Sequence, residues 1–333
     1  DAVTGCTNTM TGSTTININP LPALFTVTGG GNYCLGGSGV PVGLFTSTTG
    51  VNYQLYRGTT AVGAVVPGTG GSITFGAQTV AGAYTVVATN ATTGCTNNML
   101  GSVSVGINPL PGLFVVTGGG NYCTGGTGVN VGLSGSASGI TYQLMNGPAT
   151  VGTPVPGTGG ALSFGLQTGT GTYTVVVTNP GTGCVNTMTG SVNINTYPLP
   201  ALYTISGGGN YCSGGTGVAI GLANSTSGVS YQLMLAGSPS GSAVSGTGGA
   251  ISFGLRTSAG TYTVIATNTT TTCTNTMTGS ATVTVNPLPA AITGTTNVCA
   301  GSSTTLASTS AGGTWTSVNT AVATVGSASG VVN

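Results

Sequence analysis

The sequence predicts an all-β protein in which two-sheet β-sandwiches of about seven strands each follow one another in tandem. Three observations support this prediction. A unit of 89 residues recurs without insertion or deletion. Apolar residues alternate with polar ones in short runs that are bounded by Gly, Asn, Ser and Thr, and no helical period of comparable length occurs. Seven such runs in fewer than 90 residues imply a two-sheet sandwich.

The repeat is marked by proline triplets and by cysteines that share one period. Pro-Leu-Pro occurs four times and Gly-Gly-Gly-Asn-Tyr-Cys three times, in both cases at intervals of 89 residues. The prolines of the triplets are Pro20, Pro22, Pro109, Pro111, Pro198, Pro200, Pro287 and Pro289. Proline cannot donate to a β-ladder and keeps the preceding residue extended. We therefore expect each triplet to be a short, semi-rigid linker between sandwiches.

The strands of the first repeat are expected in the following order. They lie near Leu24 to Thr28, Val40 to Phe45, Val51 to Tyr56, Ala64 to Val66, Ser72 to Phe75, Tyr84 to Thr89 and Val103 to Ile107. Each run has apolar residues at a period of two, as in a strand with one buried face. Glycine-rich stretches between them, such as Gly68 to Gly71, predict tight turns.

The linkers divide the chain into five parts. Residues 1–19 are expected to be the C-terminal strand of a preceding repeat. Residues 23–108, 112–197 and 201–286 are expected to be three complete repeats, and 290–333 the N-terminal part of a further domain. No apolar run approaches the 18 to 20 residues that a membrane-spanning helix needs, so we expect no membrane span in this segment.

The near-absence of charge excludes several functions. The 333 residues contain two Arg (Arg57 and Arg256), one acidic residue (Asp1), no Lys and no His. General acid–base and nucleophilic catalysis lack a proton acceptor. A calcium or magnesium site needs carboxylate oxygens, for which Asp1 is the one acidic side chain, and the cysteines are too far apart in the sequence for a zinc site. Two isolated Arg make no phosphate-binding patch. We expect no enzymatic activity, no cofactor, no metal site and no nucleic-acid partner.

Several motifs resemble those of bacterial immunoglobulin-like (Ig-like) and PKD-like domains. Gly-x-Tyr-Thr-Val, first found at Gly82 to Val86, resembles the signature of strand F, and Tyr-Gln-Leu, first found at Tyr53 to Leu55, resembles strand C with Leu in place of the core Trp. The resemblance implies a tandem array of Ig-like sandwiches. It also implies that Tyr84, Tyr173 and Tyr262 are tyrosine-corner residues, whose hydroxyl groups bond back to the backbone.

The last part of the chain and the linkers narrow the resemblance. Gly313 to Ser317 and Asn319 to Val325 resemble a bacterial Ig-like group 2 domain, including its Trp. Asn-Pro-Leu-Pro between modules, with one Cys before strand B and another after strand F, is similar to giant surface adhesins or fibres of Bacteroidota that are exported by the type IX route. The resemblance covers nearly the whole chain and implies an extracellular or cell-surface location, but the same modules serve many partners.

The eight cysteines imply disulfides, whose pairing the spacing leaves open. One bridge within each repeat would join Cys34 to Cys95, Cys123 to Cys184 and Cys212 to Cys273. However, the loops before strand B and after strand F lie at opposite ends of an Ig sandwich, and a disulfide needs Cα atoms within about 7 Å. Bridges between neighbouring repeats would join Cys34 to Cys184 and Cys123 to Cys273. They would leave Cys6, Cys95, Cys212 and Cys299 for partners outside residues 1–333. Free or interchain thiols are the third alternative.

Together these features predict the structural shaft of an extracellular filament or giant cell-surface adhesin, acting as a stiff, disulfide-reinforced spacer. One alternative is an adhesive repeat whose loops bind glycan, another surface or ice, and a second is a noncovalent polymer of short subunits. Uncharged edge strands and a near-neutral surface favour association. The expected partners are therefore further copies of the chain, end to end or side by side.

Overall fold

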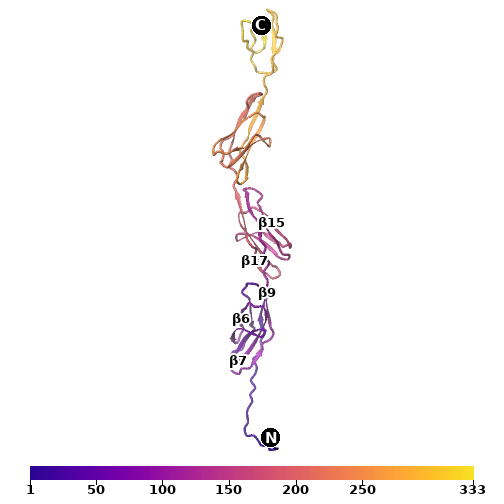
Figure 1. Ribbon diagram of the computed structural model, residues 1–333, viewed down its shortest axis with the longest axis vertical. Coiled ribbons are helices and arrows are strands. Elements are labelled where there is room, and N and C mark those ends of the chain that lie inside the picture. The colour runs from indigo at the N-terminus through magenta and orange to yellow at the C-terminus, as the bar shows by residue number, and fades with distance from the viewer. The chain divides into compact units, whose positions relative to one another are not determined.

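The computed structural model describes residues 1–333 and consists of β-strands and loops. The strands form paired sheets that recur along the chain, so the predicted fold class, a tandem array of Ig-like β-sandwiches, is confirmed (Figure 1). No helix long and apolar enough to cross a membrane is present. The chain divides into two compact units, one of residues 1–122 and 127–195 and the other of residues 123–126 and 196–333.

The first repeat packs a three-stranded sheet against a six-stranded one. The smaller sheet has the order β1 (Val27–Gly29), β3 (Val40–Leu44), β6 (Ile73–Gln78). The larger has the order β2 (Gly31–Cys34), β9 (Val103–Asn108), β7 (Gly82–Asn90), β4 (Val51–Arg57), β5 (Thr60–Pro67), and β8 (Thr96–Asn98) also pairs with β7. Figure 1 labels β6, β7 and β9 within this repeat. The apolar core lies between the two sheets.

The second repeat has the same topology, and the third differs only at the edge of the larger sheet, where the two short strands β23 and β24 replace the single edge strand. The second contains β10 (Val116–Gly118), β11 (Gly120–Cys123), β12 (Val129–Leu133), β13 (Thr141–Asn146), β14 (Ala149–Pro156), β15 (Leu162–Gln167), β16 (Gly171–Thr178), β17 (Val185–Thr187) and β18 (Val192–Tyr197). The third contains β19 (Ile205–Gly207), β20 (Gly209–Cys212), β21 (Val218–Leu222), β22 (Val229–Leu235), β23 (Ser238–Pro239), β24 (Val244–Ser245), β25 (Ile251–Arg256), β26 (Gly260–Asn268), β27 (Thr274–Thr276) and β28 (Ala281–Asn286). A separate three-stranded sheet follows, made of β29 (Thr293–Gly294), β30 (Thr304–Ala307) and β31 (Val331–Val332).

Two strands of each repeat were not expected from the sequence, and β2 is the more important. Three glycines at the junction of β1 and β2 have positive φ angles, of 90° at Gly29, 73° at Gly30 and 120° at Gly31. This conformation is accessible to glycine and costly for other residues. It lets the chain leave the smaller sheet after β1 and join the larger one, where β2 pairs in parallel with β9 from Gly31↔Val105 to Cys34↔Asn108. The three glycines therefore form the connection by which the chain passes from the smaller sheet to the larger one.

The tyrosine of β7 that recurs in each repeat has, with its equivalents, the arrangement of a tyrosine corner. Tyr84 is 1% exposed, and its hydroxyl donates to the carbonyl of Val80 at 2.7 Å. The equivalent hydroxyl groups of Tyr173 and Tyr262 donate to the carbonyls of Gly169 at 2.8 Å and Ser258 at 2.9 Å. Each bond satisfies a buried hydroxyl and fixes the loop that precedes the strand.

Each residue of Tyr-Gln-Leu has a separate role in β4. The buried hydroxyl of Tyr53 accepts the backbone N–H of Thr48 at 2.9 Å, and Leu55 is fully buried in the core. Gln54 lies between them on the opposite face, and its side-chain amide donates to the carbonyl of Val62 at 2.9 Å. That carbonyl belongs to a bulge in β5, because Tyr53 pairs with Val66 while Leu55 pairs with Val62.

The bulge also explains how an uncharged edge strand is protected from pairing with another chain. β5 is an edge strand of the larger sheet, and it combines this bulge with Pro67 at its end. The equivalent strand β14 contains Pro154 and Pro156. Bulges and prolines are alternatives to charge as protection of sheet edges. The lack of charge thus does not leave these edges open.

One loop of the third repeat is strained in a way that the other two repeats avoid. Thr272 has a φ of 60°, whereas Gly94 and Gly183 occupy the equivalent positions with φ of 71° and 70°.

We expect Thr272→Gly to raise the free energy of unfolding of the third repeat by about 1 kcal/mol, since a β-branched residue is disfavoured in this conformation. Urea denaturation measures the change. The reverse exchange, Gly183→Thr, should destabilise the second repeat, and a change of the same sign in both variants would contradict this account.

Candidate functional site

The first half of the candidate site is the cysteine at the end of β2 and its equivalents. Parallel pairing of β2 with β9 places Cys34 opposite Asn108, the residue before Pro109, and the N–H of Leu35 donates to the carbonyl of Asn108 at 2.9 Å. The same bond joins Thr124 to Tyr197 at 2.9 Å. Each cysteine of this group (Cys34, Cys123 and Cys212) therefore lies beside the linker that leaves its own repeat.

The second half is the cysteine of the loop before β8, β17 or β27. In the second repeat the carbonyl of Cys184 accepts the N–H of Asn179 at 2.9 Å, which closes the loop between β16 and β17. Two residues later, the side-chain amide of Asn186 donates to the carbonyl of Pro111 at 3.1 Å. Cysteines of this group (Cys95, Cys184 and Cys273) therefore lie beside the linker that enters their repeat.

The structure contains two disulfides, and both connect these two groups across a linker. Cys34 is bonded to Cys184 with Cα atoms 5.5 Å apart, and Cys123 is bonded to Cys273 with Cα atoms 5.6 Å apart. Both pairs are 150 residues apart in the sequence. The linker Pro109-Leu110-Pro111 is thus accompanied by a second covalent connection, from the residue next to Asn108 to the loop next to Pro111.

The pairing within each repeat does not occur in the structure. Cys34 and Cys95, Cys123 and Cys184, and Cys212 and Cys273 are the pairs in question, and the reason is their position: the two cysteines of one repeat lie at opposite linkers. The free cysteines are Cys6, Cys95, Cys212 and Cys299. The disulfide changes the solvent exposure of the cysteine in the loop before β8, β17 or β27. The bonded Cys184 and Cys273 are fully buried, whereas the equivalent unpaired Cys95 is partly exposed.

A set of asparagines in the site was not identified from the sequence. Asn97, Asn186 and Asn275 donate from their side chains to the carbonyls of Pro22 at 2.8 Å, Pro111 at 3.1 Å and Pro200 at 2.8 Å. The three prolines are buried, so their carbonyls need a protein donor. The available signal was the recurrence of Cys-x-Asn at the period of the linkers. The second proline of each linker is thereby fixed to the sandwich that follows it.

We expect Asn97→Ala to destabilise the first repeat by about 1–3 kcal/mol, because the buried carbonyl of Pro22 loses its hydrogen-bond donor. Thermal and urea denaturation of the whole chain measure the loss. Asn98→Ala is the matched control, since Asn98 is the adjacent residue and is exposed. Equal effects of the two substitutions would show that the bond to Pro22 contributes nothing to stability.

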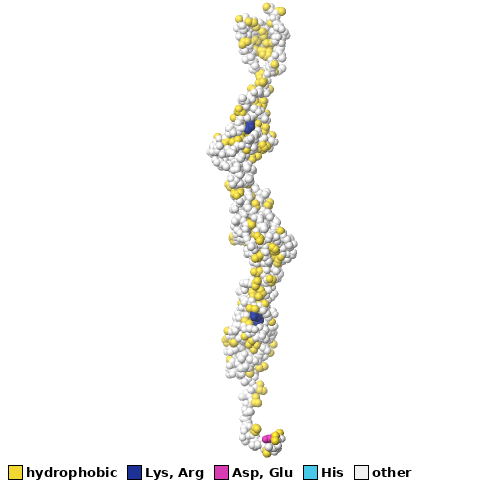
Figure 2. Space-filling model, in the orientation of Figure 1, with side chains coloured by type: hydrophobic (Ala, Val, Ile, Leu, Met, Phe, Trp, Pro, Cys, Tyr) yellow, Lys and Arg dark blue, Asp and Glu magenta, His cyan; other side chains and the backbone are white.

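The rest of the surface offers few other candidates for a site. No group of three or more His, Cys, Asp or Glu residues could hold a metal ion. The face drawn in Figure 2 carries almost only uncharged polar and apolar side chains. Of the two Arg residues, Arg256 donates to the carbonyl of Phe253 at 2.5 Å, where Gln78 and Gln167 make the equivalent bond in the other repeats. Its role is therefore structural.

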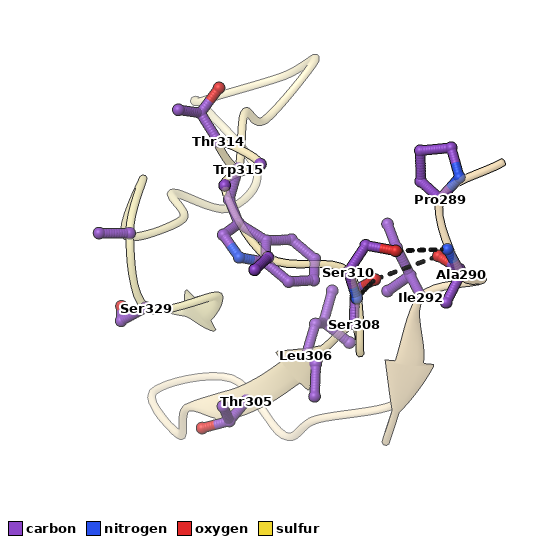
Figure 3. Close-up of a pocket in the computed structure, with 15 residues that line it drawn as sticks. Pro289, Ala290, Ile292, Thr305, Leu306, Ser308, Ser310, Thr314, Trp315 and Ser329 are labelled. Atoms are coloured by element: carbon purple, nitrogen blue, oxygen red, sulfur yellow. Dashed lines mark hydrogen bonds between the residues drawn. The ribbon is translucent and has the colours of Figure 1, made fainter. Parts of the chain in front are cut away.

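A cavity of about 550 Å³ lies in the last part of the chain. Figure 3 shows the ring of Trp315 facing it together with Leu306 and Ile292. On its rim, Ser310 accepts the N–H of Ala290 at 2.7 Å and Ser308 donates to the carbonyl of Ala290 at 3.1 Å. The lining comes from β30 and from loop residues between 289 and 329, and all of it lies outside the three repeats. It therefore does not supply the repeated binding loops of the adhesive alternative.

Comparison with known proteins adds no family. No protein-family model matches the chain, and no curated protein sequence matches it. Similar solved structures include the FN1–FN3 domains of chicken CNTN1 (10% identity, TM-score 0.27, covering 74% of this chain and 94% of that one). They also include fibronectin(III)-like modules of Clostridium thermocellum CbhA (13% identity, TM-score 0.30, covering 52% of this chain and 95% of that one). A third example is an ICAM-5 D1–D4 ectodomain fragment (16% identity, TM-score 0.32, covering 81% of this chain and 75% of that one). At these TM-scores the similarity carries no argument about function.

The fold and the site define the protein as a tandem Ig-like repeat protein with disulfides between neighbouring repeats. Disulfide-bonded Ig-like domains are typical of extracellular proteins and of structural or adhesive repeats.

Proposed function

We propose that the chain is part of the shaft of an extracellular filament or giant cell-surface adhesin, where it acts as a stiff, disulfide-reinforced spacer. The observation that carries this proposal is the double covalent connection between repeats, in which a disulfide accompanies Pro-Leu-Pro. A single short linker leaves two domains free to swing about it, whereas two connections at separate points remove most of that freedom.

Two further features support a mechanical role. The bond from Asn186 to the carbonyl of Pro111 immobilises the end of the linker against the second repeat. The main-chain bond from Leu35 to Asn108 holds its beginning against the first repeat. A flexible tether between independent binding modules would not need either contact.

Distance measurements between two repeats of the same unit test the proposal. Spin labels attached through non-natural amino acids at the exposed positions Val65 and Leu166 report the separation of the first and second repeats. We expect a narrow distance distribution in the oxidised chain and a broader one in the variant with Cys34→Ser and Cys184→Ser. Equally broad distributions in both would contradict a stiffening role for the bridge.

The proposal includes the boundaries of the repeats and further pairings of the cysteines. We take 23–108, 112–197 and 201–286 as the repeats, 1–19 as the closing strand of a sandwich, and 290–333 as the start of a group 2 Ig-like domain. In a longer array of the same repeat, the spacing of 150 residues would give partners to Cys6, Cys95, Cys212 and Cys299 in neighbouring sandwiches. The resemblance to type IX-exported proteins of Bacteroidota supports a cell-surface location.

We also propose that copies of the chain associate end to end. The bulges and prolines of β5 and β14 oppose pairing of these edges side by side. Light scattering of the whole chain as a function of concentration tests association. Glycan arrays test the adhesive alternative, and specific binding by a repeat would replace the spacer as the leading function.

A further inference from the structure

The two disulfides interleave along the sequence. Their cysteines occur in the order Cys34, Cys123, Cys184, Cys273, and the bonded pairs are the first with the third and the second with the fourth. This order arises because the separation of 150 residues within a pair exceeds the repeat period of 89. Each bridge therefore closes a covalent loop that contains one end of the other bridge, which a bridge within each repeat would not do.

We propose that the bridges turn the segments around each linker into straps that carry tension, and that the remaining part of each sandwich lies outside the covalent load path. We define a strap as the segment between two cysteines that flank one linker region, for example from Cys95, in the loop before β8, to Cys123, at the end of the next Gly-Gly-Gly-Asn-Tyr-Cys motif. The straps are 6–34, 95–123 and 184–212, each 28 residue steps long. The bridge from Cys34 to Cys184 joins the end of the first strap to the start of the third.

The straps consist of segments that are already extended in the folded protein. Strap 95–123 contains β8 and β9, the linker, and β10 and β11. An extended strand has little length left to yield under tension. The bodies between straps, such as 35–94 and 124–183, contain the other strands and most of the core.

Two straps run side by side in each complete repeat. The parallel pair of β2 with β9 joins strap 6–34 to strap 95–123 through four residue pairs, from Gly31↔Val105 to Cys34↔Asn108. The pair of β20 with β28 makes the equivalent connection, from Gly209↔Val283 to Cys212↔Asn286. The two covalent paths therefore run in the same direction and are hydrogen-bonded to each other. A load on one path is shared with the other through these ladders.

This inference rests on the proposed function as a spacer under tension, but it predicts a separate quantity, the maximum length of the chain. Between Cys6 and Cys212, the oxidised route comprises two straps and one bridge, 56 residue steps, whereas the reduced chain has 206. At up to about 3.6 Å per residue these are about 200 Å and about 740 Å. Unfolding of the bodies adds no length in the oxidised chain.

Single-molecule force spectroscopy measures this length. The whole chain carries Cys95→Ser and Cys299→Ser, so that the exposed thiols of Cys6 and Cys212 accept the handles through thioether bonds. We expect a final contour length of about 200 Å under oxidising conditions and about 740 Å after reduction. A variant with Cys34→Ser and Cys184→Ser retains only the other bridge and should reach 178 residue steps, about 640 Å.

Each other outcome contradicts the inference in an identifiable way. A length of 145 residue steps, about 520 Å, in the oxidised chain would show a bridge within the second repeat, from Cys123 to Cys184, since Cys95→Ser removes the equivalent bridge of the first repeat. A length near 740 Å without reduction would show that neither bridge carries load. The spacer proposal fails separately, through broad distances between the labels at Val65 and Leu166, and that result would leave the contour length unchanged.

Discussion

Replacing both cysteines of the Cys34–Cys184 bridge by Ser should lower the free energy of unfolding of the unit of 1–122 and 127–195 by about 5 kcal/mol. The chain-entropy model gives this value because the bridge closes a loop of 150 residues in the unfolded chain. The double replacement leaves no unpaired thiol of the bridge behind. Calorimetry and urea denaturation of the oxidised whole chain measure the loss.

Cys95→Ser is the matched control for this prediction. Cys95 occupies the position equivalent to Cys184 but is free and partly exposed, so its replacement should change stability by less than about 0.5 kcal/mol. If the double variant unfolded at the same urea concentration as the parent chain, the bridge would be either absent in solution or without effect on the unfolded ensemble.

Gly68→Ala should destabilise the first repeat by about 3 kcal/mol or more, because the new methyl group has no space. A Cβ at Gly68 would collide with the backbone carbonyl of Thr48 and also meet the ring of Tyr53. The carbonyl cannot move aside, because the N–H of Gly68 is bonded to the carbonyl of Val51 at 2.8 Å and holds the two segments together. The equivalent Gly157 and Gly246 meet the carbonyls of Ala137 and Thr226 in the same way.

Gly71→Ala provides a control three residues away in the same turn. A Cβ at Gly71 would meet only the hydroxyl of Thr69, at 3.9 Å, which is ordinary contact. Its effect should stay within about 0.5 kcal/mol. Urea denaturation followed by tyrosine fluorescence compares the two variants, and similar losses would show that general turn flexibility, rather than the collision at Gly68, sets the cost.

The strands that the sequence predicted are those with a buried face and a clear period of two. β4 and β7 are examples, since Tyr53, Leu55, Tyr84 and Val86 alternate with less buried residues and are at most 1% exposed. The strands β2 and β8 were missed because their sequences, Gly-Asn-Tyr-Cys and Thr-Asn-Asn, lack that period. They form because their main chains pair with β9 and β7, a long-range effect that local composition does not record.

The contacts at the linkers could be predicted only in part. Pro-Leu-Pro and the cysteine spacing identified the junction as the important region, and the argument from strand length favoured bridges between neighbours. The hydrogen bonds from Asn97, Asn186 and Asn275 to proline carbonyls could not be predicted from the sequence, since they join residues 75 apart in the sequence. The protection of uncharged edges by bulges was equally hidden, because a bulge is a property of the register between two strands.

The sequence by itself determined that this is a nearly uncharged, all-β, tandemly repeated protein with cysteines and prolines on one period of 89 residues, since composition and repeats follow from the order of the residues alone. Only the tertiary structure decided which cysteines meet. The parallel pairing of β2 with β9 carries Cys34 to the leaving linker, and the hairpin before β17 holds Cys184 at the same linker. Whether two cysteines 150 residues apart in the sequence come close depends on the strand pairing within both sandwiches, which only the folded chain shows.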